Sequence, residues 1–164
     1  MNPFPEPLLQ WLETLAPARA VRSGQWTYPM AESLHVVGIA VMVGAAMLFD
    51  LRLLGAAGRH VPVSSAARWL LPVSWAGFGL VALTGMLMFS ANATLLADNP
   101  AFQLKLALIL LAGANALVFR LGPYRRVAVW DTATAAPLPA KAVAVVSLLA
   151  WTVVTVCGRL IAYV

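Results

Sequence analysis

Four long stretches of the chain contain no charged side chain, and this pattern predicts the main elements. The charge-free stretches are residues 33–49, 69–97, 106–119 and 142–158. One helical crossing of a bilayer needs roughly 20 apolar residues. The third stretch is shorter, but it extends over 101–121 if Lys105 and Arg120 reach the headgroups with their charged ends. The pattern therefore predicts four membrane-spanning helices, at about 30–54, 66–96, 100–121 and 140–163.

The segment before the first span has a different pattern. Leu8, Trp11, Leu12 and Leu15 recur at helical spacing, so residues 7–16 place an apolar stripe on one face of a helix. Polar residues occupy the other face. This pattern is typical of a short helix lying in the membrane interface, and Pro17 is expected to end it.

Composition agrees with a membrane protein. Of the 164 residues, 62% are hydrophobic and 10% are charged, and the mean hydropathy is +0.84. Such a chain has too little polar surface to cover a water-soluble globule. We therefore predict an all-α fold, an integral membrane four-helix bundle with a short N-terminal interfacial amphipathic helix, formed by residues 1–164 as a single membrane domain.

The basic residues indicate an orientation rather than a nucleic-acid partner, although the net charge is +5. They are spread over the loops and not gathered on one face. Residues 52–68 and 120–141 together hold seven of the 11 Lys and Arg residues, and the opposite side holds four. Cytoplasmic loops carry the excess of basic residues, so both termini are expected on the outer, periplasmic side.

One outer polar layer is expected to draw on all four spans. Glu32 and His35 begin the first span, Lys105 the third, and Arg159 ends the fourth. Glu32 and His35 are three residues apart and share a helical face, so they could bind a metal ion, orient a ligating histidine or pass a proton. The alternative is a set of interfacial ion pairs among Glu32, Lys105 and Arg159, with His35 hydrogen-bonded.

Deeper in the bundle, the pattern predicts structural contacts. Asp50 and Arg120 lie 15 residues after His35 and Lys105, respectively, and we expect them to pair near the inner headgroups. Asn115 needs an interhelical hydrogen bond because lipid offers it no partner. Small residues at four-residue steps, such as Gly44, Gly77 and Gly85, predict close helix contacts.

Four motifs in the chain carry a resemblance to known families. They are Glu32-Ser-Leu-His35-Val-Val-Gly38, Asp50-Leu-Arg-Leu-Leu-Gly55, Asn99-Pro-Ala-Phe-Gln-Leu-Lys105 and Gly158-Arg-Leu-Ile-Ala-Tyr163. Over most of its length the chain resembles a bacterial family of four-helix inner-membrane proteins of unknown function. It is more distantly similar to the copper-resistance D membrane domain and the membrane protoporphyrinogen oxidases, which are associated with haem.

The more distant resemblance implies that His35 is an axial haem ligand and that Lys105 contacts a propionate or a substrate. The chain departs from a two-histidine pattern because its spans contain one histidine, and the third span ends in Arg120 where relatives are expected to offer another. His60 lies in the inner loop, roughly a membrane thickness from His35. A second ligand would come from Met88, Met30 or another subunit, or the position stays open.

These observations leave three hypotheses. The first is a small redox-linked inner-membrane protein or subunit that binds haem b near the outer face through His35, with Lys105, Arg159 and Met88 as further cofactor contacts. The second is a component that handles or transports copper or another divalent metal and binds it through Glu32 and His35. The third is a cofactor-free structural subunit of a membrane complex. The expected partners are lipid and either further copies or a larger membrane complex, not nucleic acid. Whether the protein is an enzyme stays open.

Overall fold

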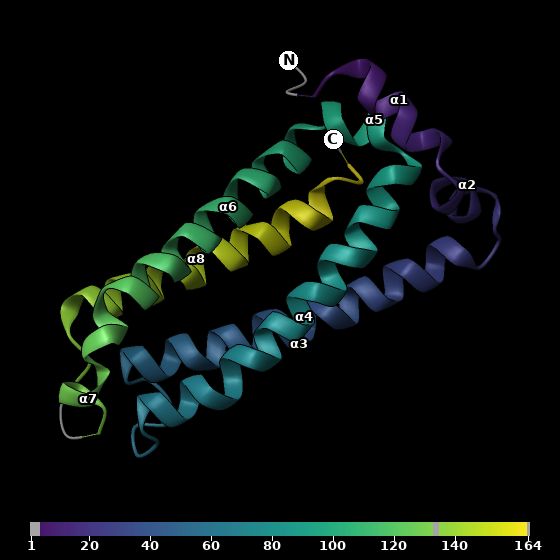
Figure 1. Ribbon diagram of the computed structural model, residues 1–164. Helices are drawn as coiled ribbons and strands as arrows, with labels where there is room; N and C mark the ends of the chain where they lie inside the picture. Colours follow the sequence, from purple (N-terminus) through teal and green to yellow (C-terminus); the bar gives the residue numbers. More distant parts are fainter. Residues whose placement is uncertain (1–3, 133–134, 164) are drawn as a thin grey trace.

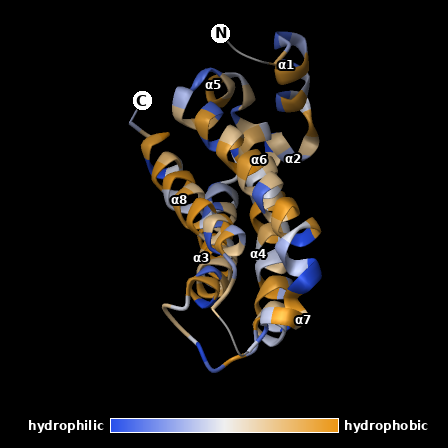
Figure 2. Cartoon of the chain, turned by 90° about the vertical axis from the view of Figure 1, so that its left-hand side faces the viewer, coloured by the Kyte–Doolittle hydropathy of each residue, from blue (hydrophilic) through white to orange (hydrophobic). Residues whose placement is uncertain are grey.

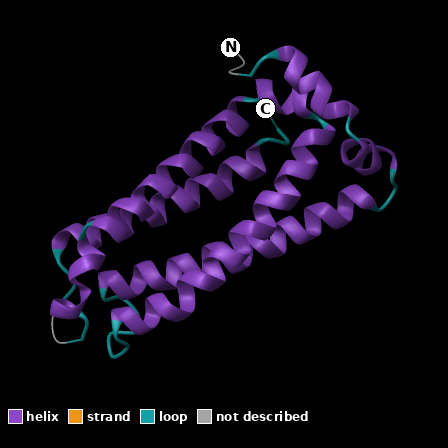
Figure 3. Ribbon diagram, viewed as in Figure 1, coloured by secondary structure: helices purple, strands orange, loops and turns teal. Residues whose placement is uncertain are grey.

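Four long helices dominate the computed structural model, which describes residues 4–132 and 135–163 (Figure 1). They are α3 (Thr27–Leu54), α4 (Val63–Ala91), α6 (Pro100–Leu121) and α8 (Leu138–Leu160). Each is long and apolar enough to cross a membrane. The described residues contain no strand, so the predicted all-α membrane fold is confirmed (Figure 3).

The long helices associate as two pairs. α3 packs along α4, α6 packs along α8, and contacts between α3 and α8 join the pairs. Within the described residues, no Cα atom of α4 comes within 8 Å of a Cα atom of α6. Both chain termini lie at one end of the bundle, which we call the terminal end. The opposite end, with the α3–α4 loop and the α6–α8 connection, is called the loop end.

Two short helices, α1 (Glu6–Thr14) and α2 (Ala16–Ser23), precede the first long helix. The sequence pattern predicted one short helix here, with Pro17 as its end. Instead Pro17 lies in the first turn of α2, where proline is tolerated because the first helical N–H groups have no partner in the helix. The Glu13 carboxylate accepts hydrogen bonds from the Thr94 backbone N–H (2.9 Å) and hydroxyl (2.8 Å), and so ties α1 to α5 (Ala93–Asp98).

The second predicted span, which was expected to continue to residue 96, ends earlier. Asn92 leaves the helical conformation, with φ −141° and ψ 46°, and separates α4 from α5. At the next helix start the sequence pattern is followed closely. Pro100 stands in the first turn of α6, and the Asn99 side chain accepts a hydrogen bond from the Phe102 N–H at 3.1 Å.

The four long helices consist mainly of hydrophobic residues (Figure 2), and many of their large apolar side chains are exposed. Leu83, Leu110 and Leu149 are each more than half exposed. Outward apolar surface of this extent fits a lipid environment and indicates a multi-pass membrane protein. At the loop end, a buried apolar cluster around Phe49, Leu53 and Phe119 holds the two helix pairs together. There α6 continues through the short helices η1 (Pro123–Arg126) and α7 (Val127–Trp130).

Candidate functional site

His35 lies on α3 and faces α4, where it meets Thr84. The distance from His35 Nδ1 to Thr84 Oγ1 is 2.9 Å. The Thr84 hydroxyl has one proton, and it donates that proton to the Leu80 carbonyl one turn earlier, at 2.7 Å. With that proton on the Leu80 carbonyl, Thr84 accepts from His35, and we assign the proton of a neutral imidazole to Nδ1; the Val81 carbonyl is a second acceptor near the ring. Nε2 then carries the free lone pair, and no hydrogen bond to Nε2 is found in the part of the chain that the structure describes.

Glycines on α3 and α4 allow this contact. A Cβ atom on Gly85 would lie 3.0 Å from His35 Cε1, and one on Gly77 would lie 2.7 Å from the Met42 backbone nitrogen. On α3, a Cβ atom on Gly38 would lie 2.9 Å from a methyl carbon of Val81. Helices that approach this closely keep the imidazole against α4, so the orientation of His35 depends on backbone packing as well as on Thr84.

Lys105, at the start of α6, faces the same region. Its side chain is partly buried, and Nζ lies 3.7 Å from the position that a Cβ atom on Gly158 would occupy. The ammonium is close enough to His35 and to Cys157 for its charge to act on both. Across the described residues, the Lys105 ammonium has no hydrogen bond and no ion pair. A partly buried cation therefore lies within electrostatic reach of His35 without a counter-charge of its own.

The other residues predicted for this layer lie apart from that pair. Glu32 is exposed on α3, and its charge acts on Tyr28, one turn earlier. Arg159 is exposed at the end of α8, where its guanidinium donates to the Tyr163 hydroxyl (2.9 Å) and covers the Tyr163 ring. The ion pairs expected among Glu32, Lys105 and Arg159 are absent from the described residues, in which Arg22 and Glu13 form the one ion pair.

Met88 follows Thr84 by one turn on the same face of α4 and is partly buried. Met30, the other methionine considered as a haem ligand, is 61% exposed at the beginning of α3. His60 is exposed in the α3–α4 loop, at the opposite end of the bundle from the His35 region. Among Met88, Met30 and His60, only Met88 lies on the same helix as Thr84.

At the loop end, the predicted Asp50–Arg120 pair does not form. Asp50 is buried between α3 and α8, where Ser147 approaches its carboxyl group, and its Oδ2 atom has no hydrogen-bond partner. Arg120 is exposed on α6. The two helices do not pack against each other, and this explains why the charges stay apart. Asn115 does find an interhelical partner, because its side-chain amide donates to the Val143 carbonyl at 2.9 Å.

Thr84 is the site residue that the sequence pattern did not reveal. Threonine can satisfy its hydroxyl within its own helix, so a single threonine in an apolar span carries little signal. The available clue was its position one turn before Met88 in an otherwise apolar segment. No group of three His, Cys, Asp or Glu side chains comes together within residues 4–132 and 135–163 in a way that could hold a metal ion.

Comparison with known proteins gives a family but no function. Residues 11–164 match a family of unknown function, DUF6644. The chain belongs to this family. The match covers all four long helices, so the DUF6644 region includes both His35 and its partner Thr84. No curated protein and no solved structure matches the chain significantly.

Proposed function

We propose that this protein is a small redox-linked membrane protein or subunit that binds haem b through His35. The observation that carries the proposal is the 2.9 Å hydrogen bond between His35 Nδ1 and Thr84 Oγ1, in which we assign His35 as the donor. Histidines that ligate metals usually donate their other ring N–H to an acceptor, which fixes the tautomer and the direction of the lone pair. Thr84 is such an acceptor, and Nε2 would then be available to hold the haem iron.

Lys105 supports the same proposal through its charge. Haem b carries two propionate groups, and an unpaired, partly buried ammonium is a suitable partner for a carboxylate. Lys105 has no such partner among the described residues and lies close enough to His35 for their charges to interact. The donor set therefore suits a ligand that offers both a metal centre and an anionic group.

The remaining contacts are assigned more loosely. Met88, which follows Thr84 by one turn on the same face of α4 and is partly buried, would be a thioether contact to the cofactor. Arg159 would reach a propionate only by leaving Tyr163. A bound haem would supply one-electron redox chemistry, and the chain's own residues would orient it and neutralise its charge. In a bacterial inner membrane, the excess of basic residues at the loop end would place the terminal end and its site on the periplasmic side.

The test is the absorbance spectrum of protein purified in detergent after expression with ample haem. Under this proposal, wild type shows a Soret band and a reduced-minus-oxidised difference spectrum of haem b. His35→Ala abolishes both without unfolding the helices. His60→Ala is the matched control, since it removes a histidine at the opposite end and should leave the spectrum unchanged.

Thr84→Val tests the orienting hydrogen bond separately. Valine keeps the shape but cannot accept from Nδ1, so haem affinity should fall about tenfold while helix content stays constant. A wild-type protein without a Soret band would refute the haem assignment. Elemental analysis of the same sample would then distinguish the second hypothesis, copper or another divalent ion at Glu32 and His35, from a cofactor-free structural subunit.

A further inference from the structure

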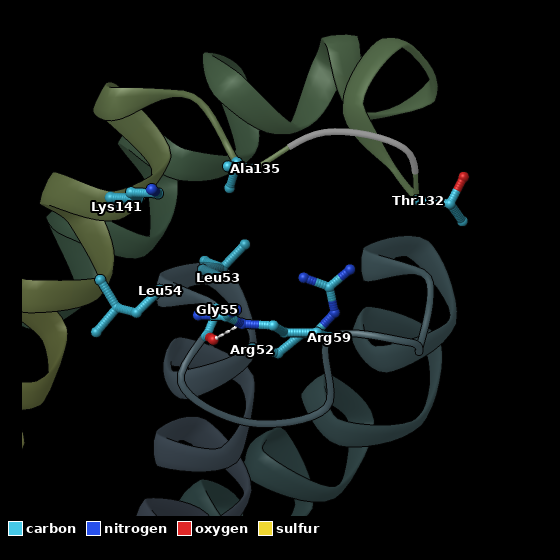
Figure 4. A pocket seen from close by; sticks show the side chains of 9 residues that line it. Arg52, Leu53, Leu54, Gly55, Arg59, Thr132, Ala135 and Lys141 are labelled. Atoms are coloured by element: carbon cyan, nitrogen blue, oxygen red, sulfur yellow. Dashed lines mark hydrogen bonds between the residues drawn. The ribbon is translucent and has the colours of Figure 1, made fainter.

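The loop end contains a pocket with a volume of about 320 Å³, separate from the His35 region. Its walls come from the end of α3, the α3–α4 loop, the segment before α8 and the first turn of α8. Three cationic side chains line it: Arg52, Arg59 and Lys141. In Figure 4, Lys141 enters from α8, and the Arg59 side chain runs from the α3–α4 loop to Gly55, where its Nε donates to the Gly55 carbonyl.

Among the described residues that line the pocket, these three cations have no acidic side chain beside them. The Asp131 carboxylate lies near Arg52, and Ser64 bonds to both of its oxygens, through the backbone N–H at 2.8 Å and the hydroxyl at 2.6 Å. The Asp131 charge still interacts with Arg52. Asp50 is buried in the α3–α8 contact and does not line the pocket. Cations gathered in one hollow repel one another, so an anion in the pocket would stabilise the arrangement.

Two hydrogen bonds to backbone carbonyls hold the Arg52 side chain beside the pocket. This side chain is 8% exposed, its Nε donates to the Val61 carbonyl at 2.5 Å, and Nη2 donates to the Asp131 carbonyl at 3.3 Å. A guanidinium has five N–H donors, so two are used by the backbone and three remain for a ligand. Arg59 uses only its Nε, on the Gly55 carbonyl.

The start of α8 adds a further favourable feature. Its N-cap residue, Pro137, offers no side-chain cap, and its first turn contains no acidic residue. The positive end of the α8 dipole favours an anion nearby, but the Ala140 and Lys141 N–H groups are bonded to the Pro137 carbonyl and contribute through the dipole only. The Lys141 side chain has no hydrogen bond or ion pair among the described residues, so its ammonium is also available.

We propose that this pocket binds a phosphate-bearing anion, held by the guanidinium forks of Arg52 and Arg59 and by Lys141. Arginine forks match phosphate oxygens in geometry as well as charge. The volume is at the lower end of the roughly 300–1,000 Å³ typical of small-molecule sites, which suits a phosphate with a small ester group. Because the pocket lies at the end of four membrane-crossing helices, the phosphate could belong to an anionic lipid or to a soluble phosphate ester.

Two binding measurements test the proposal on the full chain. Phosphatidylglycerol binding is measured by native mass spectrometry of protein from phosphatidylcholine nanodiscs, and glycerol 3-phosphate binding by calorimetry in detergent. Wild type should bind at least one of the two probes. Binding of the lipid alone identifies a bilayer lipid, and binding of the ester alone identifies a soluble ligand. Binding of both identifies the phosphate as the recognised group, and binding of neither overturns the proposal.

The double variant Arg59→Gln with Lys141→Gln should raise the dissociation constant by about tenfold or more, since it removes two charged donors. Arg125→Gln with Arg126→Gln is the matched control, because it removes the same charge from exposed positions at the same end. It should change binding by less than about twofold if the pocket recognises the anion. If both double variants lost the same amount of affinity, general surface charge would explain the binding, and the proposal would be overturned.

A third variant, Arg59→Lys, keeps the charge and removes the fork. A site that recognises phosphate through paired N–H donors should bind several-fold more weakly in this variant, whereas simple charge attraction predicts no change. An unchanged affinity would refute the role given to the Arg59 guanidinium. Circular dichroism and gel filtration of every variant confirm that the helices remain folded. Haem binding at His35 should be unaffected throughout, so the two proposals fail or stand independently.

Discussion

The contact between α3 and α4 can be tested at a single glycine. In Gly77→Ala, the added methyl carbon would lie 2.7 Å from the Met42 backbone nitrogen and 3.0 Å from Met42 Cα. Ordinary contacts between carbon atoms are about 3.5–4.0 Å, so α3 must move away by close to 1 Å. The obstacle is helix backbone, which cannot rotate aside as a flexible side chain would.

The expected magnitude follows from two opposing effects. Overpacking of this kind costs about 1–3 kcal/mol, and we expect the upper half of that range here. Alanine in place of glycine stabilises a helix by about 1 kcal/mol. Gly79→Ala gains the same helix propensity, but no heavy atom lies within 4 Å of its new methyl group. The difference between the two variants therefore isolates the steric cost, at about 2–3 kcal/mol with Gly77→Ala the less stable.

The assay is reversible unfolding by dodecyl sulfate in mixed micelles, followed by circular dichroism, with both variants in the same detergent. Since Thr84 lies two turns after Gly77, the shift of α3 should also weaken the hydrogen bond from His35. Nitrogen-15 resonances of the imidazole would report this as a less pure Nδ1–H tautomer. Stabilities of Gly77→Ala and Gly79→Ala within about 0.5 kcal/mol of each other would refute the packing argument.

Two polar contacts outside the spans give further predictions. The Ser64 hydroxyl and backbone N–H hold the pKa of Asp131 below its usual range, so its stabilisation is fully present above about pH 4 and is lost as pH falls through the folded pKa. Asp131→Asn should lower the unfolding free energy by about 1–2 kcal/mol at neutral pH and make it less dependent on pH in the acid range. If the variant kept the same loss of stability in acid as wild type, Asp131 would not be the group responsible. Glu13→Gln should weaken the attachment of α1 to Thr94, whose hydrogen bonds likewise lower the pKa of Glu13. Hydrogen exchange should then rise in α1 and α2 but not in the four long helices, and equal exchange in both proteins would exclude this role.

Glycine spacing alone was a poor guide to which glycines make close contacts. Gly77 and Gly85 were expected at helix contacts, and both are found there. Gly44 was expected as well, but no heavy atom lies within 4 Å of a Cβ built on it. Gly38, which the four-residue steps did not single out, meets Val81 closely. The spacing identifies faces that are able to pack, whereas the rotation of each helix decides which face does.

Depth in the membrane could also be predicted, but neighbours could not. Counting residues from the helix starts placed Asp50 level with Arg120, yet α3 and α6 do not pack together and the pair does not form. The same counting placed His35 and Lys105 at one level, and these two do lie within electrostatic reach. Two side chains on different spans can come together only if they lie at the same depth and if their helices are also neighbours.

The amino-acid sequence by itself determined the four apolar helices, because only long charge-free runs are apolar enough to lie in lipid, and in lipid the backbone must satisfy its hydrogen bonds within a helix. It also determined the start of α6, since Asn99 caps the helix and Pro100 occupies its first turn, and both effects are local in the sequence. Tertiary structure alone decided the partner of His35, because Thr84 is 49 residues away and meets it only through the close approach of α3 and α4. It likewise decided the gathering of Arg52, Arg59 and Lys141 around one pocket, as these side chains come from segments that only the packed loop end brings together.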